Sequence, residues 1–197
     1  MTNRPSLRSH FRILRQQLDA DARAEKVQRL NEHLSELRVL RQARNIAAYL
    51  ASPEEASVTP FMEIAWQRSQ AVFLPWIDEQ PRKMVFRRYQ PDSVLVKNRF
   101  GLLEPDTQND AASAHELDCV MVPLVAFDDA GTRLGMGGGY YDSFFTEAKG
   151  RPVLIGIAFS EQRATEPLPK AAWDVALDMV VTDAGITQFI TPGTTWD

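Results

Sequence analysis

Apolar residues recur at three- and four-residue steps in two stretches near the start of the chain, residues 7–18 and residues 27–37. This spacing places apolar side chains on one face of a helix, so it predicts two amphipathic helices. Asp19 and Asp21 lie between the two stretches and are candidate caps for the second helix.

Short apolar runs follow, and each has the length and composition of a buried strand. They are Asn45–Ala51, Ala71–Leu74, Met84–Tyr89, Leu117–Leu124, Val153–Phe159 and Met179–Thr182. A helix is expected from Thr59 to about Arg68, because a capping hydroxyl precedes a proline there. The polar stretch 91–116 is predicted to be a loop.

Strands that are apolar on both faces and alternate with helices favour a mainly parallel sheet covered on both sides. The expected fold class is α/β, a three-layer sandwich with a Rossmann-like sheet and helices on both faces. Ligands of such folds bind beyond the carboxyl ends of the strands. With 197 residues and no repeat or low-complexity linker, we expect a single domain over residues 1–197.

Hydrophobic residues make up 44% of the chain and charged residues 24%, which excludes a disordered chain. No apolar run is long enough to span a membrane. Cys119 is the single cysteine, so no intramolecular disulfide can form, and arginines stand where a signal peptide needs apolar residues. We therefore expect a cytoplasmic protein. The three histidines are scattered, which argues against a zinc site.

Charge is unevenly distributed along the chain. Residues 1–44 carry ten Arg and Lys against five Asp and Glu, whereas the rest carries 12 basic and 21 acidic residues. A basic segment on an acidic body indicates either a nucleic-acid contact or a site for an anionic ligand. The arginines of this segment are interleaved with a regular apolar stripe, and the segment contains few aromatic residues. A surface on which nucleic-acid bases stack would need such aromatic residues, so this pattern argues against a nucleic-acid contact.

The densest chemical signal is the run 133–142, RLGMGGGYYD, which opens a predicted helix. Its four glycines let backbone N–H groups approach a phosphate closely, and Arg133 can grip phosphate oxygens. The run is neither a Walker A loop nor a dinucleotide fingerprint. The residues of this run that we expect at a ligand are Arg133, Leu134, Gly135, Met136, Gly137, Gly138, Gly139, Tyr140 and Tyr141.

Asp142 ends this run at the start of the predicted helix. A carboxylate there is favourable to the helix dipole without any ligand. Beside bound phosphates it is also placed to hold Mg²⁺, which takes one or two carboxylates together with phosphate oxygens. The alternative for the whole run is a plain glycine turn. A turn does not require two tyrosines and an aspartate directly after the glycines, so their presence argues against this alternative.

Together with PLVAFD at 123–128, the run 133–142 resembles the signature of the 5-formyltetrahydrofolate cyclo-ligases, also called 5,10-methenyltetrahydrofolate synthetases. The resemblance covers nearly the whole chain. It implies an enzyme that uses ATP to close 5-formyltetrahydrofolate to 5,10-methenyltetrahydrofolate, with release of ADP and phosphate after phosphorylation of the formyl oxygen. ATP is then a co-substrate bound by residues 133–141, and Mg²⁺ is the cofactor.

The resemblance also implies roles outside this run. Arg8 and Arg12, four residues apart on the first predicted helix, match a family pair that contacts the ATP phosphates. Leu50 and Glu55 match the family's folate contacts in the loop after the first strand, and Glu54 competes for the role of Glu55.

Asp174 matches a late acidic motif of the family and is implied to be the second magnesium contact, whereas Asp178 is as well explained by a structural hydrogen bond. Tyr140 is expected at the folate as well as at the nucleotide, and the division of roles between Tyr140 and Tyr141 stays open. Residues 98–105 resemble the segment that closes over the substrate. Cys119, inside an apolar strand, is expected in the core.

Two other functions fit parts of the sequence. Another phosphate-ligand enzyme on a similar sheet would share the glycine run, and a non-enzymatic nucleotide or nucleic-acid binder would use the basic segment. The cyclo-ligase reading accounts for both features. The expected partners are 5-formyltetrahydrofolate and ATP, with no nucleic acid and no membrane, and we expect a monomer.

Overall fold

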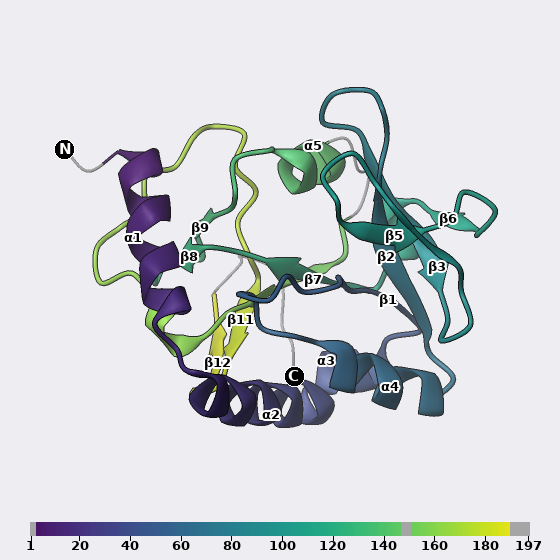
Figure 1. Ribbon diagram of the computed structural model, residues 1–197, viewed down its shortest axis with the longest axis horizontal. Helices are drawn as coiled ribbons and strands as arrows, with labels where there is room; N and C mark the ends of the chain where they lie inside the picture. The colour runs from purple at the N-terminus through teal and green to yellow at the C-terminus, as the bar shows by residue number, and fades with distance from the viewer. Residues whose placement is uncertain (1–2, 147–150, 190–197) are drawn as a thin grey trace.

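The computed structural model describes residues 3–146 and 151–189, with an eight-stranded sheet at its centre (Figure 1). The order of the strands is β12-β11-β10-β7-β1-β2-β3-β6. Their bounds are β1 (Asn45–Ala47), β2 (Ala71–Ile77), β3 (Met84–Tyr89), β6 (Ala111–Ala112), β7 (Cys119–Pro123), β10 (Val153–Ile157), β11 (Met179–Thr182) and β12 (Gly185–Gln188). The strands from β11 to β2 pair in parallel, whereas the pairs β11–β12, β2–β3 and β3–β6 are antiparallel. The mainly parallel sheet is confirmed.

Helices cover both faces of this sheet. They are α1 (Arg4–Gln16), α2 (Ala20–Glu36), α3 (Arg38–Gln42), α4 (Thr59–Gln67) and α5 (Tyr140–Thr146), with short 3₁₀ turns η1 (Ala114–Glu116) and η2 (Ser160–Gln162). In Figure 1, α2, α3 and α4 lie on one face and α5 on the other. The expected three-layer α/β fold is therefore confirmed. None of the helices in the described part is long and apolar enough to cross a membrane.

Helix α1 stands apart from the two helical layers, beside a small ribbon of β8 (Ala126–Phe127) and β9 (Arg133–Leu134). Its Phe11 is buried in a cluster with Ala126 and Leu134. This contact brings the basic N-terminal helix next to the strand from which the glycine run starts.

Strand β7 shows why the central strands are apolar throughout. Cys119 and Met121 pack into the layer of α2, α3 and α4, whereas Val120 and Val122 pack into the layer of α5. All four side chains are fully buried. Alternate residues therefore face two different layers, and neither face can be polar. Burial raises the pKa of the Cys119 thiol to about 12, as befits the expected core cysteine.

The predicted helix starts are correct for α2 and wrong in one detail for α4. Asp19 caps α2 by accepting a hydrogen bond from a backbone N–H of the first turn at 2.8 Å, and Asp21 lies within that turn. Thr59, however, is the first helical residue of α4 and not its cap, which is Val58. The Thr59 N–H donates instead to the Ser57 hydroxyl at 3.3 Å.

The stretch 91–116 is more ordered than the predicted loop. It contains the hairpin of β4 (Leu95–Lys97) and β5 (Leu103–Pro105), and β6, which extends the main sheet. Strands of two or three residues are too short to show an alternating pattern, so the sequence gives no signal for them. The first predicted strand also ends earlier than expected, at Ala47.

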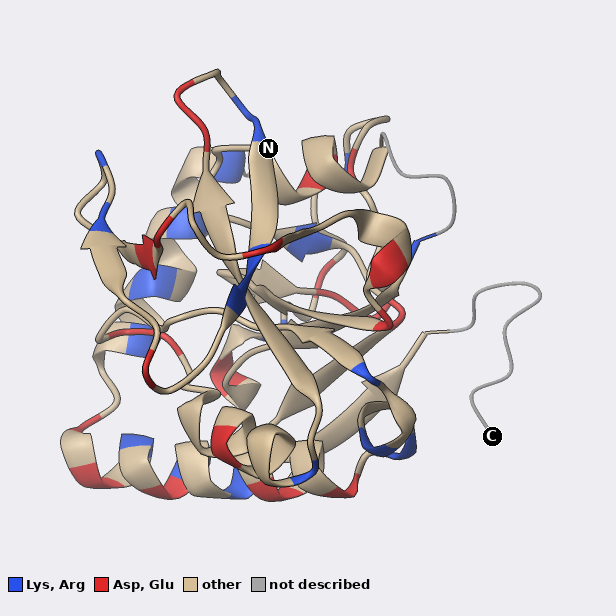
Figure 2. Cartoon of the chain, turned by 90° about the vertical axis from the view of Figure 1, so that its right-hand side faces the viewer, with Lys and Arg blue, Asp and Glu red and all other residues tan. Residues whose placement is uncertain are grey.

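Acidic residues from the rest of the chain meet the basic surplus of the first 44 residues. Arg15 pairs with Glu54 at 3.1 Å, and Lys26 pairs with Asp183 at 2.7 Å. On the side of the molecule drawn in Figure 2, basic and acidic residues are interspersed. Part of the charge asymmetry along the sequence is thus balanced inside the fold.

Candidate active site

A cavity of about 1030 Å³ opens beyond the carboxyl ends of the parallel strands. Tyr49 and Leu50 after β1, Pro75 and Ile77 in β2, and Leu124 after β7 line it. The chain turns to opposite sides of β1 to form β2 and β7, so the cavity lies at the topological switch point of the sheet. This is where open α/β sheets bind ligands, and its volume suits a large ligand or two smaller ones.

The glycine run forms one wall of this cavity. Gly137 and Gly139 have φ values of 101° and 72°, in the left-handed region that favours glycine. The Arg8 side chain lies directly against the run: its Nε donates to the Gly135 carbonyl at 2.7 Å, and its Cζ lies 3.3 Å from where a Cβ on Gly137 would be. The run therefore has a backbone conformation that needs glycine, and a guanidinium group borders it.

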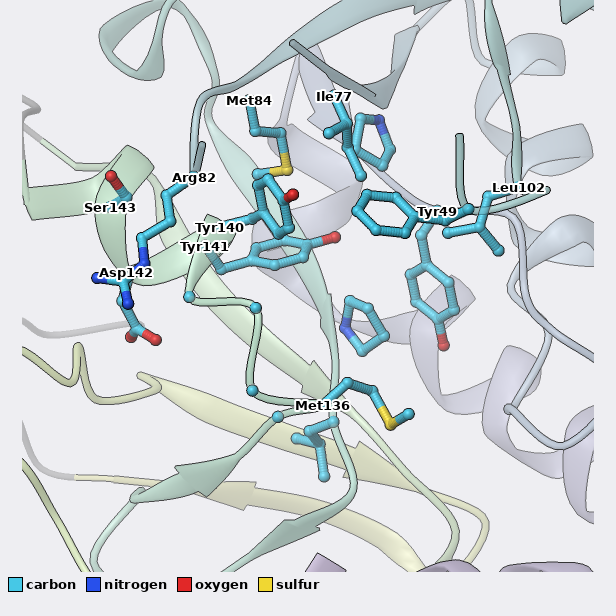
Figure 3. Close-up of a pocket in the computed structure, with 18 of the residues that line it drawn as sticks. Tyr49, Ile77, Arg82, Met84, Leu102, Met136, Tyr140, Tyr141, Asp142 and Ser143 are labelled. Atoms are coloured by element: carbon cyan, nitrogen blue, oxygen red, sulfur yellow. The ribbon is translucent and has the colours of Figure 1, made fainter. Parts of the chain in front are cut away.

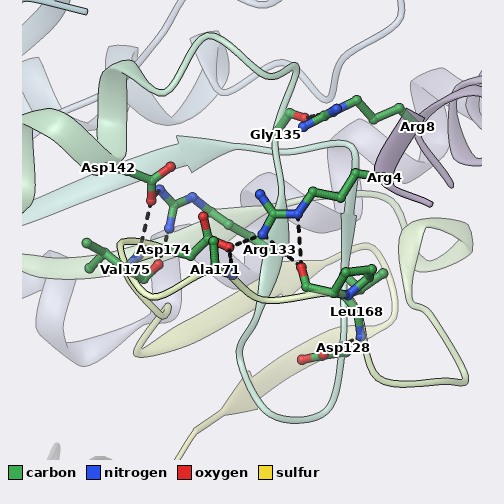
Figure 4. A network of polar contacts seen from close by, with 11 residues as sticks. Arg4, Arg8, Asp128, Arg133, Gly135, Asp142, Leu168, Ala171, Asp174 and Val175 are labelled. Atoms are coloured by element: carbon green, nitrogen blue, oxygen red, sulfur yellow. Dashed lines mark hydrogen bonds and ion pairs between the residues drawn. The ribbon is translucent and has the colours of Figure 1, made fainter. Parts of the chain in front are cut away.

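Arg133 is buried next to the cavity and pairs with Asp142. Its guanidinium donates to Asp142 Oδ1 at 2.6 Å and to the Val175 carbonyl, and the Val175 N–H donates to the same Asp142 oxygen at 3.1 Å (Figure 4). The structure thus brings together two residues that the sequence assigned to phosphate and to magnesium.

Arg4 makes a corresponding pair with Asp174. The Arg4 guanidinium donates to the Asp174 carboxylate and to the Pro169 carbonyl, the latter at 2.9 Å (Figure 4). The same carboxylate accepts the Ala171 N–H at 2.8 Å. Arg4 was missed by the sequence reasoning. The sequence did contain a signal for Arg4, because Arg4 and Arg8 have the same four-residue spacing as Arg8 and Arg12.

Arg12 lies outside the cavity. Its side chain is 44% exposed and lies 3.9 Å from Glu54, whereas Arg4 and Arg8 line the cavity. Apart from Glu54 and Asp178, the other candidate residues named from the sequence line it as well: Leu50, Glu55, Arg133, Leu134, Gly135, Met136, Gly137, Gly138, Gly139, Tyr140, Tyr141, Asp142 and Asp174.

The structure also separates the two competing glutamates. Glu54 turns toward α1, where hydrogen bonds from Gln16 and Arg15 hold the pKa of its carboxyl below the ordinary value. Glu55 lines the cavity and accepts the Ser52 N–H at 2.9 Å. Geometry therefore favours Glu55 as the one that meets a ligand.

The other end of the cavity is apolar and aromatic, and Figure 3 shows its side chains converging. Its residues are Tyr49, Ile77, Met84, Phe100, Leu102, Met136, Tyr140 and Tyr141. Ile77, Met84, Phe100 and Leu102 were missed, because a single apolar residue in a strand or loop carries no recognisable functional signal. The rings of Phe100 and Tyr140 meet edge to face, with centroids 6.3 Å apart, and Phe100 lines the cavity, so the 98–105 segment reaches it.

Two tyrosine hydroxyls at this end differ in their partners. The Tyr49 hydroxyl donates to the Ala56 carbonyl at 2.6 Å. The Tyr141 hydroxyl is buried and has no hydrogen-bond partner within the described ranges. Burial raises the pKa of both phenols, so both stay protonated. An orphaned buried hydroxyl beside a cavity fits a site completed by a ligand.

The chemistry of the donor set decides whether Mg²⁺ fits. Residues 3–146 and 151–189 contain no group of three or more His, Cys, Asp or Glu that could hold a metal by itself. Asp142 and Asp174 both line the cavity and supply two carboxylates. Mg²⁺ binds commonly through one or two carboxylates plus substrate phosphates and water, so the donor set fits magnesium only together with a phosphate ligand.

Comparison with known proteins identifies the relatives of this chain. The model of the 5-formyltetrahydrofolate cyclo-ligase family matches residues 1–183. The chain belongs to the 5-formyltetrahydrofolate cyclo-ligase family. A cyclo-ligase of Haemophilus influenzae is 35% identical over 178 residues, covering 88% of this chain and 94% of the relative. One of Escherichia coli is 36% identical over 152 residues, covering 75% and 82%.

Solved structures of the cyclo-ligase family have the same fold. The 5,10-methenyltetrahydrofolate synthetase of Aquifex aeolicus superposes with a TM-score of 0.83 at 26% identity, covering 98% of this chain and 95% of that one. The corresponding protein of Mycoplasma pneumoniae gives a TM-score of 0.76 at 23% identity, covering 92% and 99%. The family resemblance carried by residues 123–142 is confirmed.

Proposed function

We propose that this protein is an ATP-dependent 5-formyltetrahydrofolate cyclo-ligase, which forms 5,10-methenyltetrahydrofolate and releases ADP and phosphate. The observation that carries the proposal is one cavity with two unlike ends. One end gathers arginines, the carboxylates of Asp142 and Asp174 and the glycine run, and the other gathers aromatic and apolar side chains around the Glu55 carboxylate. The first suits a polyphosphate and the second a flat heterocycle.

The arginine end would bind the triphosphate of ATP. We assign Arg4 and Arg8 as the phosphate-contacting pair of α1, since both line the cavity and Arg12 does not. The backbone of Gly135–Gly139 would supply N–H donors, and Arg133 would act through Asp142, with which it is paired at 2.6 Å.

Asp142 and Asp174 would hold Mg²⁺ together with the phosphates. Each carboxylate is anchored by an arginine and by a backbone N–H from residues 171–175, so both are oriented before any ligand arrives. When bound, the ion would offset negative charge on the phosphoryl group that is transferred.

The aromatic end would bind the folate. The Glu55 carboxylate can accept hydrogen bonds from the amino group and ring N–H of a pterin. Leu50, Tyr49 and Tyr140 provide apolar contact surface around it. The orphaned Tyr141 hydroxyl lies at this end and would donate to an oxygen of the substrate.

The arrangement accounts for the difficult step of the reaction. A formyl group on nitrogen is amide-like, and its oxygen is a poor leaving group. Transfer of the γ-phosphoryl group of ATP to that oxygen converts it into a phosphate, ADP leaves, and the second folate nitrogen attacks the carbon. That nitrogen then loses its proton, and the phosphate is expelled as the ring closes. The protein contributes mainly position and charge, because phosphoryl transfer needs no nucleophilic side chain.

We infer further that the protein acts on these small molecules as a cytoplasmic monomer, without nucleic acid. Basic residues of the first 44 residues pair with acidic residues of the fold. Several exposed apolar side chains, Phe100, Leu102, Leu103, Met136 and Trp173, line the cavity and so need no protein partner. A molar mass of two chains, measured by size-exclusion chromatography with light scattering, would contradict the inference that the protein is a monomer.

The proposed function is tested by following the absorbance of the methenyl product from 5-formyltetrahydrofolate with and without Mg-ATP. The expected result is product formation only with ATP, with one ADP released per product. Product formed equally without ATP, or none with it, would overturn the proposal. A variant that lacks the cavity carboxylate Asp142 controls for a contaminating enzyme.

A further inference from the structure

A second arginine borders the glycine run from the side opposite α1. Arg82 lies in the turn between β2 and β3, which is closed by a hydrogen bond from the Asp78 N–H to the Lys83 carbonyl at 3.0 Å. The turn brings Arg82 to the wall of the cavity, at the same end as Asp142 and Ser143 (Figure 3). Its φ of 61° is in the left-handed region, which is uncommon for an arginine.

The distances to the glycine run place two guanidinium side chains around it. A Cβ on Gly139 would lie 3.8 Å from Arg82 Cδ and Nε, and a Cβ on Gly137 would lie 3.3 Å from Arg8 Cζ. Arg8 comes from α1 and Arg82 from the β2–β3 turn, so the run lies between arginines from two separate elements.

The charges of the cavity arginines are not equally available. Arg4 and Arg133 are each paired with a carboxylate, Asp174 and Asp142 respectively. The Arg82 side chain is exposed and forms no hydrogen bond or ion pair with any residue in 3–146 or 151–189. The Arg82 guanidinium therefore lies next to the glycine run without a carboxylate partner, and its charge is available to an anionic ligand.

We propose that Arg82 is a further nucleotide-binding residue, which contacts the phosphates of ATP from the side opposite Arg4 and Arg8. This inference rests on the proposed function, because it takes the ligand of the glycine run to be ATP. The ATP phosphates then lie between α1 and the β2–β3 turn, and the polyphosphate end of the cavity is built from three chain segments.

Asn and Lys substitutions separate charge from fold at this position. Asn adopts the left-handed conformation more readily than Arg, so R82N removes the charge while keeping the turn. R82K keeps the charge. The matched control is K83N: Lys83 is the adjacent residue, is 53% exposed, does not line the cavity and pairs with Asp78 at 3.6 Å.

The experiment is calorimetric titration of each purified variant with Mg-ATP, together with KM for ATP and for 5-formyltetrahydrofolate. R82N is expected to lower the affinity for Mg-ATP about tenfold, which is the usual effect of losing one charge-assisted hydrogen bond. KM for the folate and Tm should stay at the wild-type values. R82K should recover most of the ATP affinity, and K83N should bind ATP like the wild type.

The outcomes distinguish this inference from the proposed function. Wild-type ATP affinity in R82N, or an equal loss in R82N and K83N, overturns the role of Arg82 even if the enzyme makes the methenyl product. ATP binding that is weakened only in R82N upholds that role even if no methenyl product is formed, in which case the proposed function fails alone.

Discussion

The two ends of the cavity are constructed differently. At the polyphosphate end, Arg133 with Asp142 and Arg4 with Asp174 hold each other in place before a ligand arrives. At the aromatic end, the walls are apolar and the Tyr141 hydroxyl is buried without a partner within the described ranges. One end is thus preorganised by internal ion pairs, and the other has a polar group that a ligand would satisfy. Charge should govern binding at the first end, and shape and a few hydrogen bonds at the second.

The largest expected effect follows from breaking the partly buried pair of Arg133 and Asp142 at the polyphosphate end. D142N leaves the Arg133 charge without its carboxylate and removes a proposed magnesium ligand. We expect kcat/KM for ATP to fall about 100-fold, the free energy of unfolding to fall by about 3 kcal/mol and the magnesium requirement to rise. Steady-state kinetics, a magnesium titration and urea unfolding measure these changes.

A matched control exists for this substitution. Asp129 also pairs with an arginine, Arg163, at 2.6 Å, but its side chain is 71% exposed and lies outside the cavity. D129N should leave kinetics and stability within error of the wild type. An unchanged magnesium titration for D142N would remove Asp142 from the proposed metal site.

The next effect tests which arginines of α1 belong to the site. R8Q should raise KM for ATP about 30-fold, because it removes a guanidinium that borders the glycine run. R12Q makes the same change one turn further along the helix, where the side chain lies outside the cavity, and should change KM for ATP less than twofold. Equal effects of the two substitutions would contradict the assignment of Arg4 and Arg8 as the phosphate pair.

A smaller effect is expected at the aromatic end from the two adjacent glutamates. E55Q should raise KM for 5-formyltetrahydrofolate about tenfold, whereas E54Q should leave it unchanged.

The E54Q variant should instead change how the stability of the protein depends on pH. The pKa of Glu54 is lowered in the folded protein, so the stabilising contribution of its carboxylate is present above the ordinary pKa of 4.5 and is lost as the pH falls below it.

Thermal unfolding as a function of pH measures this contribution. The Tm of the wild type should fall more steeply than that of E54Q below about pH 4.5. Parallel curves for the two proteins would contradict the role of Glu54 as an anchor for α1. A folate KM raised more by E54Q than by E55Q would reverse the assignment of the two residues.

The smallest expected effects come from removing the buried hydroxyls of Tyr49 and Tyr141. Y49F removes a hydroxyl that is hydrogen-bonded to Ala56, and should lower the free energy of unfolding by about 1 kcal/mol. Y141F removes a buried hydroxyl without a described partner, and should leave stability unchanged or raise it while weakening folate binding about fivefold. Equal destabilisation by the two variants would show that the Tyr141 hydroxyl is already satisfied in the free protein.

The sequence predicted the parts of this site that lie in one continuous segment. The run 133–142 carries its own signal, because several glycines followed by tyrosines and an aspartate have few structural explanations. The central strands were equally recognisable, since both faces of β7 and β10 are buried and the runs are apolar throughout. Local composition was sufficient in both cases.

Composition and spacing alone did not predict the parts that depend on how separate segments meet. A four-residue spacing fits Arg4 with Arg8 as well as Arg8 with Arg12, and only the packing of α1 on β8 and β9 decides between them. The β4–β5 hairpin was missed because three-residue strands show no periodicity. Arg82 carried no signal at all, because its role depends on a turn that brings it beside Gly139.

The central claim is that the two ends of one cavity hold ATP and 5-formyltetrahydrofolate at the same time. The most direct measurement is a calorimetric titration of 5-formyltetrahydrofolate into the protein saturated with a non-hydrolysable ATP analogue and Mg²⁺. The account predicts that one folate binds per chain and that its affinity is equal to or higher than that without the analogue. A folate affinity that falls in proportion to the analogue concentration would mean that both ligands compete for one end, and would contradict the account.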